Sequence, residues 1–117
     1  MNIITIAAAM LVAVTEPPGP GAPDCAGPND WPALMAAAHL KSTRIANEEE
    51  LDFSKTRVLR LASEPRGKRV HRQLHLVAFA AKSGQLIHVI TVNDASEELC
   101  SESAVDVFVI SRQWSGT

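Results

Sequence analysis

The clearest pattern of apolar residues lies in the carboxyl-terminal half of the chain. Segments 70–81 and 86–93 are rich in Val, Leu and Ile, and the four residues 82–85 separate them. Two apolar segments joined by a short turn that contains glycine are typical of a β-hairpin. The pattern therefore predicts a hairpin with Ser83 and Gly84 at its tip.

The tip determines which residues of the hairpin lie opposite one another. If Lys82 pairs with Gln85, then Phe79 lies opposite His88, and side chains alternate between two faces. One face is expected to hold His75, Val77, Phe79, Leu86, His88, Ile90 and Val92. The other is expected to hold Leu74, Leu76, Ala78, Ala80, Ile87 and Val89. Both faces are apolar and need cover: a helix can cover one, and the amino-terminal segment, a second chain or a partner must cover the other.

Two further strands are predicted beside this hairpin. Residues 104–114 alternate valines with Asp106, Phe108 and Ile110. Residues 57–62 also alternate, and proline and glycine at 65–67 predict the turn that follows them. These segments extend the hairpin into an antiparallel meander.

A helix is predicted to precede the strands. Asp30 is a helix-capping residue, and Pro32 is tolerated in the first turn, where no backbone donor is required. The helix is expected to end before Asn47. The apolar residues at helical spacing, which predict its buried face, are Leu34, Met35, Ala38 and Ile45. The predicted fold class is α+β: an antiparallel meander of three to four strands with one amino-terminal helix packed on it.

The first thirty residues differ from the rest in composition. Residues 3–14 form an apolar run broken only by Thr5, which suits a secretory leader and is too short to cross a bilayer of about 30 Å as a helix. Five prolines in 15–29 disfavour helix and sheet and predict an extended tether. The expected organisation is a leader at 1–15, a tether at 16–29 and a single domain at 30–117.

This layout predicts a periplasmic or secreted protein. Two features count against a cleaved leader: no Lys or Arg precedes the apolar run, and Ala22 is followed by Pro23 where a permissive residue is needed. The alternative is a cytoplasmic protein in which the run is a strand or helix buried in the fold.

The two cysteines bear on the same question. Cys25 lies in the tether, and Cys100 lies in loop 93–103 between the last two strands. The four carboxylates of this loop disfavour a reactive thiolate, and their spacing, without a glycine, does not fit a calcium loop. Asp94 and Glu97 instead predict a capped helical turn. A disulfide between the two cysteines is the preferred prediction, with two free thiols as the alternative, and it would require an oxidising compartment.

Charge is distributed unevenly, although the formal net charge is only −2. Segment 55–72 holds seven basic residues and one acid, and would suit an acidic partner; the acidic loop 93–103 would suit a basic one. The alternative for both is a solvated surface. The candidate partner-binding residues are Arg66, Lys68, Arg69, Arg72, Glu97, Glu98 and Glu102. Aromatic residues make up 4% of the chain and tyrosine is absent, which disfavours nucleic acid as the partner because bases have little to stack on.

The residues that could carry chemistry are sparse. His71 and His75 would lie about 13 Å apart on a strand, too far to share a zinc ion whose ligands lie at about 2 Å. His75 and His88 come out about as far apart in the expected hairpin. The chain has no serine nucleophile elbow, phosphate-binding glycine loop, Cys-x-x-Cys pair or His-Glu-x-x-His motif. A non-enzymatic protein is therefore expected, with no catalytic residues, no metal and no cofactor.

Residues 89–111, VITVNDASEELCSESAVDVFVIS, resemble the carboxyl-terminal part of small exported proteobacterial proteins of unknown function. The layout of a tether and one disulfide is similar to that of periplasmic immunity or inhibitor proteins that neutralise toxins. The resemblance implies a binding role through protein–protein contact. We therefore expect a small exported binding protein with a protein partner, and a homodimer through the sheet is a further expectation. The alternative is a cytosolic regulatory or nucleic-acid-associated module that uses segment 55–72.

Overall fold

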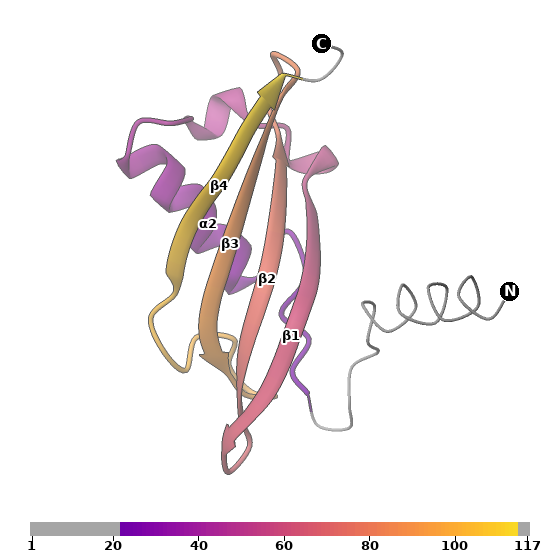
Figure 1. The fold of residues 1–117 in the computed structure, drawn as a ribbon, viewed down its shortest axis with the longest axis vertical. Helices are drawn as coiled ribbons and strands as arrows, with labels where there is room; N and C mark the ends of the chain where they lie inside the picture. The colour runs from indigo at the N-terminus through magenta and orange to yellow at the C-terminus, as the bar shows by residue number, and fades with distance from the viewer. Residues whose placement is uncertain (1–21, 115–117) are drawn as a thin grey trace, which may run out of the picture.

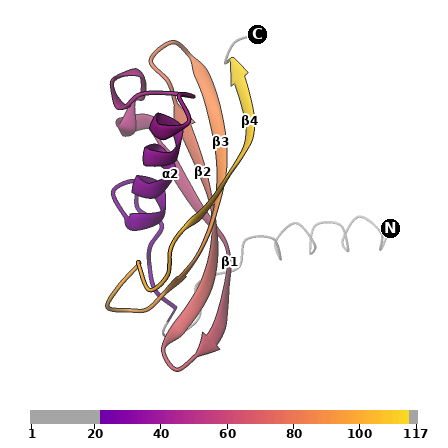
Figure 2. The ribbon, with the colours of Figure 1, turned by 90° about the vertical axis from the view of Figure 1, so that its left-hand side faces the viewer.

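The computed structural model describes residues 22–114, with side chains described as far as Arg112. The leader predicted at 1–15 and the first part of the predicted tether lie outside these residues. The described part is a long, twisted antiparallel sheet with a helical layer on one side (Figure 1, Figure 2). None of its helices is long and apolar enough to span a membrane.

The sheet is a meander of four strands in the order β1-β2-β3-β4, each antiparallel to the next. The strands are β1 (Arg57–Gly67), β2 (Val70–Ala80), β3 (Gln85–Ala95) and β4 (Asp106–Trp114). One helix, α2 (Trp31–Ser42), packs on this sheet. The predicted α+β meander with an amino-terminal helix is confirmed.

The ends of α2 are defined by local contacts. Asp30 is the N-cap residue but does not cap through its side chain; its carboxylate accepts a hydrogen bond from Gly27 N at 2.7 Å instead. At the other end, the hydroxyl of Thr43 donates to a carbonyl of the last turn at 2.7 Å. Arg44 then adopts a φ of 60°, a left-handed conformation that cannot continue a right-handed helix.

The buried face of α2 is not the predicted one. Leu34 is 43% exposed and Ala38 is also exposed. The residues that α2 buries against the sheet are Ala33, Ala36, Ala37 and Leu40. The prediction was wrong because α2 is apolar on most sides, so apolar spacing did not single out one face. The alanines face the sheet because their small side chains let the helix approach it closely.

Two 3-10 helices, η1 (Glu48–Glu50) and η2 (Phe53–Lys55), connect α2 to β1. Asn47 and Glu50 form a capping box at η1, in which the Glu50 carboxylate accepts from Asn47 N at 2.9 Å. Leu51, between the two helices, is buried and forms a bridge with Ala81. This connection therefore closes the core near the turn between β2 and β3.

The register of the β2–β3 hairpin differs by one residue from the predicted register. Phe79 pairs with Ile87, and not with the residue that follows it. The difference arises because Ala81 N donates to Gln85 O, which closes a turn of three residues and not of two. The last of these three residues, Gly84, has a φ of 96°, as a three-residue hairpin turn requires.

This shift changes which residues share a face, because a slip of one residue moves a whole strand's side chains to the other side. His75, Val77 and Phe79 of β2 share a face with Ile87, Val89 and Thr91 of β3. Leu74, Leu76 and Ala78 share the opposite face with Val92, Ile90 and His88. The hydrophobic core lies on the first of these faces, between α2 and the sheet, and includes Val77, Phe79, Ile87 and Val89.

β1 is longer than predicted. The strand continues through Pro65 to Gly67, and the turn to β2 falls at Lys68 and Arg69. The proline is tolerated because β1 is an outer strand of the sheet, where a missing backbone donor breaks no ladder hydrogen bond on the free side. The turn prediction at 65–67 was therefore wrong by two residues.

Candidate functional site

The two faces of the sheet have different surroundings. α2, η1, η2 and the segment that precedes α2 lie over one face, which we call the covered face (Figure 2). On the opposite side, which we call the open face, no element of residues 22–114 lies over the strands (Figure 2). The open face is therefore the face of the sheet that is available for contact with another molecule.

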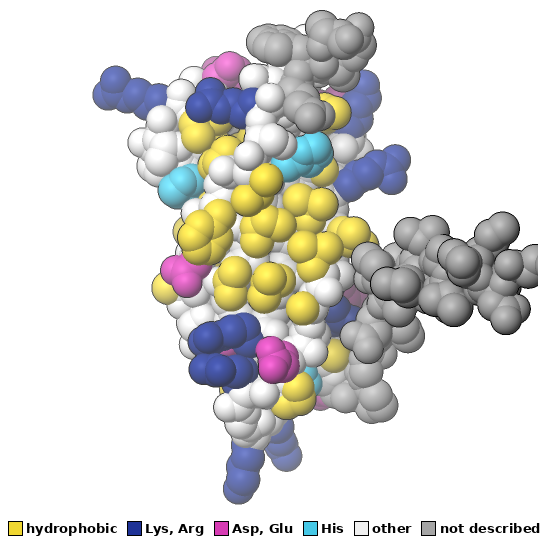
Figure 3. All heavy atoms as spheres, viewed as in Figure 1, with side chains coloured by type: hydrophobic (Ala, Val, Ile, Leu, Met, Phe, Trp, Pro, Cys, Tyr) yellow, Lys and Arg dark blue, Asp and Glu magenta, His cyan; other side chains and the backbone are white. Residues whose placement is uncertain are grey.

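A band of apolar side chains crosses the open face. Leu59 of β1 pairs with Leu76 of β2, which pairs with Ile90 of β3, which pairs with Phe108 of β4. Directly paired residues point to the same side of a sheet, so these four side chains form a continuous row. The two end members, Leu59 and Phe108, are each 53% exposed. Figure 3 shows the apolar patch to which they belong at the centre of this face.

The neighbouring rows widen the apolar band. Leu74 pairs with Val92 in the next row on one side of it; on the other side the row of Ala78 and His88 comes first, and Ala80 pairs with Leu86 beyond that row. Further large apolar side chains, Leu61 and Ile110, are 42% and 59% exposed at irregular positions of the outer strands. An apolar surface this wide is rare on a monomeric soluble protein and usually marks an interaction site.

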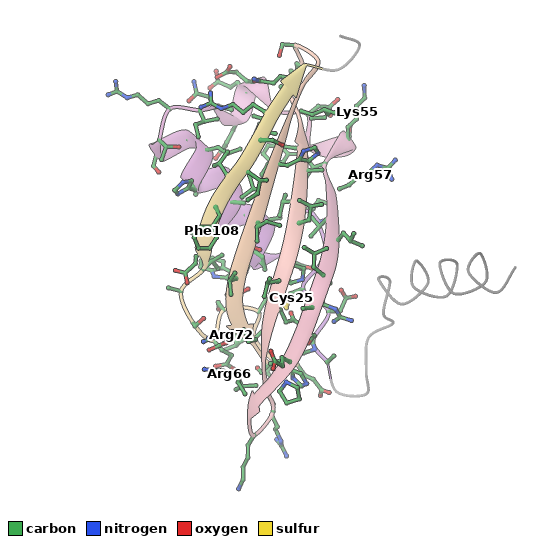
Figure 4. The ribbon with its side chains drawn as sticks, viewed as in Figure 1. Cys25, Lys55, Arg57, Arg66, Arg72 and Phe108 are labelled. Carbon is green, nitrogen blue, oxygen red and sulfur yellow. A yellow bond between two sulfur atoms is a disulfide. The ribbon has the colours of Figure 1, made fainter. Side chains whose placement is uncertain are left out.

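One end of the open face is acidic. Arg72 Nε lies 3.0 Å from Asp94 Oδ1, and Glu64 of β1 lies opposite Arg72 in the strand register. The hydrogen bond to Asp94, and then the charges of Asp94, Asp106 and Glu64, raise the pKa of the Arg72 guanidinium. Arg66 lies at the same end (Figure 4), so three carboxylates and two cations leave this end of the open face with a small net negative charge.

The opposite end of the open face is basic. Arg57 pairs with Ala78, which pairs with His88, and Lys55 lies just before β1. His88 Nδ1 lies 3.1 Å from the hydroxyl of Ser111, its partner on β4. Figure 4 shows Lys55 and Arg57 at one end of the sheet, Arg72 towards the other, and Phe108 between them. The apolar band thus has a basic region on one side and an acidic region on the other.

The disulfide joins the segment before α2 to the loop between β3 and β4. Cys25 and Cys100 are bonded, which confirms the predicted pair and leaves no free cysteine among residues 22–114. Gln73 Nε2 donates to Pro23 O at 2.9 Å, and Asn93 Nδ2 donates to Cys100 O at 2.6 Å. These contacts hold the segment before α2 against the covered face. A disulfide of this kind indicates an oxidising compartment.

Beneath that segment the covered face is polar. Gln73 pairs with Asn93, and His75 pairs with Thr91; the exposed fraction of each is 2% or less. The atoms without a hydrogen-bond partner are Gln73 Oε1, both ring nitrogens of His75, Thr91 Oγ1 and Asn93 Oδ1. The predicted register did not bring these residues together. The sequence did contain a signal for this cluster: polar residues stand two positions apart in each of the two apolar segments, at 73 and 75 and at 91 and 93.

Acidification is expected to destabilise the protein through His75. Burial, followed by the charge of Arg60, lowers the pKa of His75 from 6.5 to about 4. Because the pKa of His75 is lower in the folded protein than in the unfolded chain, protonation favours unfolding. The free energy of unfolding is therefore unaffected above pH 6.5 and falls as the pH is lowered, by about 3 kcal/mol at pH 4. Urea unfolding of the protein and of His75→Gln at pH 7 and pH 4 measures the difference. An equal loss in both proteins would contradict the prediction.

The two predicted charged clusters lie side by side. Lys68 and Arg69 of the β1–β2 turn and Glu97, Glu98 and Glu102 of the β3–β4 loop line one hollow of about 570 Å³. The sequence had suggested two separate surfaces for partners of opposite charge. The cations and carboxylates of this hollow instead offset each other.

The other two candidate cations lie elsewhere. Arg66 is exposed near the end of β1, and Arg72 forms the ion pair with Asp94 on the open face. The helical turn predicted to be capped by Asp94 is wrong, because Asp94 belongs to β3 and binds Arg72. The loop is organised by Ser96, whose hydroxyl accepts from Leu99 N at 3.1 Å and donates to Glu102 Oε2 at 2.6 Å.

No group of three or more His, Cys, Asp or Glu side chains is placed to hold a metal ion in the part of the chain that the structure describes. Comparison with family models gives no match, and comparison with the curated proteins and with the solved structures gives no similar protein either. The open face, with its apolar band and its oppositely charged ends, is accordingly the candidate site on which a function is proposed.

Proposed function

We propose that this protein is a small, exported, non-enzymatic binding protein whose open face docks a protein partner. One observation carries the proposal: the row from Leu59 to Phe108 crosses all four strands without cover from residues 22–114. A sheet with two apolar faces needs a layer on each of them. Docking of another protein supplies the second layer.

The chemistry of the open face describes the partner. Its centre needs an apolar surface that can exclude water from Leu76 and Ile90. Its ends need charges of opposite sign, basic opposite the region of Glu64 and acidic opposite Arg57. Burial of the apolar band would supply most of the affinity, and the charged ends would set the orientation.

Export is supported by the Cys25–Cys100 disulfide, which persists in the periplasm or outside the cell. An immunity or inhibitor protein is one class of exported protein that acts through a docking surface alone. That role fits the resemblance of residues 89–111, and it needs no catalytic residue or cofactor.

The alternative, nucleic-acid association through segment 55–72, has less support. Arg60 donates to Pro23 O at 3.0 Å on the covered face, and Arg72 is paired with Asp94. Lys68 and Arg69 share their hollow with three glutamates. Four of the seven cations in the segment are therefore engaged within the chain, which leaves Lys55, Arg57 and Arg66 to line a phosphate backbone.

Site-specific crosslinking tests the proposal. A photoreactive phenylalanine analogue at Phe108 is expected to form an adduct with a protein in the exporting cell, because this side chain would lie inside the interface. The matched control is the same analogue at Leu34, an exposed apolar position on the outer side of α2. Mass spectrometry identifies the partner, and its purified form should bind the protein but not Phe108→Glu. Adducts of equal yield at both positions, or none at Phe108, would contradict docking on the open face.

A further inference from the structure

We infer that the partner of the open face is a second copy of this chain, packed face to face about a two-fold axis that runs across the strands. The inference rests on the proposed function, since it names the partner of the same face. Three properties of the open face support a second copy: its size, the sign of charge at its two ends, and the spacing of the charged residues.

The open face is large enough for a stable pair. Four strands of nine to eleven residues, at about 4.8 Å between strands and about 3.3 Å per residue, present a face of about 700 Å². A specific interface buries about 800 Å² on each partner, and two stacked sheets bury their apolar faces at a separation of about 10 Å. The apolar band occupies the middle of this area, where a packed interface is most apolar.

The charge at the two ends determines the direction of the axis. An axis along the strands would bring the acidic ends of both copies together and place Glu64, Asp94 and Asp106 against their equivalents. An axis across the strands brings the acidic end of each copy against the basic end of the other. Like charges oppose association and opposite charges favour it, so the axis across the strands is selected.

The spacing of the charged residues fixes where the axis crosses. Arg57 and Glu64 pair with residues six positions apart on β2, so they lie about 20 Å apart, and the row halfway between them is that of Arg60. Arg60 pairs with His75 of β2, and His75 pairs with Thr91 of β3. An axis along this row brings Arg57 of each copy opposite Glu64 of the other, once on each side of the interface.

The same row satisfies a second pair of charged or polar residues. Thr91 lies halfway along β3 between His88 and Asp94, so an axis through it also brings His88 of one copy opposite Asp94 of the other. The row is flanked on the open face by Ile90 and Val92, which belong to the apolar band. One axis therefore brings the charged ends into register and packs the apolar residues of β2 and β3, Leu76 and Ile90, against Leu74 and Val92 of the other copy.

Measuring the mass of the oxidised full-length protein over a range of concentrations tests this inference. Light scattering or equilibrium sedimentation is expected to show a dimer that dissociates on dilution. Phe108→Glu is expected to raise the dissociation constant about a hundredfold, because it replaces an aromatic side chain of the apolar band by a carboxylate inside the interface. Leu34→Glu, at an exposed position on α2, is expected to leave the dissociation constant unchanged.

A charge exchange tests the axis itself. Arg57→Glu and Glu64→Arg are each expected to raise the dissociation constant about tenfold, because symmetry repeats each repulsive contact twice. The double variant Arg57→Glu, Glu64→Arg is expected to restore it. The two positions are too far apart to contact each other within one chain, so restoration requires a second copy. Circular dichroism and thermal unfolding of every variant confirm that each chain folds.

Each other outcome overturns the inference. A dimer that is insensitive to Phe108→Glu would be paired through an outer strand, and a double variant as weak as the single ones would exclude the proposed axis. A monomer at all concentrations excludes the second copy. If that monomer still crosslinks to a different protein at Phe108, the proposed function stands; if it forms no adduct there, the proposed function fails as well.

Discussion

Replacing Cys25 and Cys100 together by serine is expected to lower the free energy of unfolding by about 4 kcal/mol. The bond joins residues that are 75 positions apart, and the chain-entropy model assigns this cost to the freedom that the unfolded chain regains. Urea unfolding of the oxidised protein, the reduced protein and the double serine variant measures the loss.

The loss should also be visible at one place in the folded protein. Without the bond, the segment around Pro23 is held mainly by hydrogen bonds from Gln73 and Arg60. Backbone amides of this segment should then exchange with solvent faster than those of the central strands. A loss of less than about 1 kcal/mol would mean that the hydrogen bonds alone hold the segment.

Phe79→Ala is expected to lower the free energy of unfolding by about 3 to 5 kcal/mol. Phe79 is fully buried at the centre of the core between α2 and the sheet, and its removal leaves a cavity that its neighbours cannot fill. Thermal and urea unfolding at one protein concentration measure the change.

The matched control is Phe53→Ala. Phe53 lies in η2, and 36% of it is exposed, so its truncation removes fewer packing contacts and leaves a site that water can enter. Its loss should be less than half that of Phe79→Ala. Equal losses would show that the core does not lie on the face that the observed register assigns to it.

The elements themselves were predictable because their apolar patterns are long. Segments 70–81 and 86–93 could only pair as a hairpin, and the alternation in 104–114 added the last strand. The cysteine pair was predictable because the carboxylates near Cys100 left few other roles for it. The need for a layer on a second apolar face also followed from the pattern alone.

The composition of each face was not predictable, because it depends on a turn. A two-residue turn and a three-residue turn are both common in hairpins, and the sequence at 82–85 does not decide between them. The choice nevertheless places Ile87 opposite Phe79 where His88 was predicted. The charged ends of the open face and the polar cluster around His75 both follow from that choice. The buried face of α2 was not predictable for a different reason. The alanines at 33, 36 and 37 are buried because their small side chains let the helix pack close to the sheet, and hydropathy does not measure side-chain size.

The outer strands limit how far assembly can proceed. Each has an irregular register, between Arg60 and Ala62 and between Pro65 and Gly67 in β1, and opposite His88 and Val89 in β4. Pro65 also lacks the amide hydrogen that a further strand would need. Edges of this kind do not template the indefinite addition of strands by which exposed sheets polymerise into fibrils. The protein can therefore expose an apolar sheet face without the accompanying risk of amyloid growth along its edges.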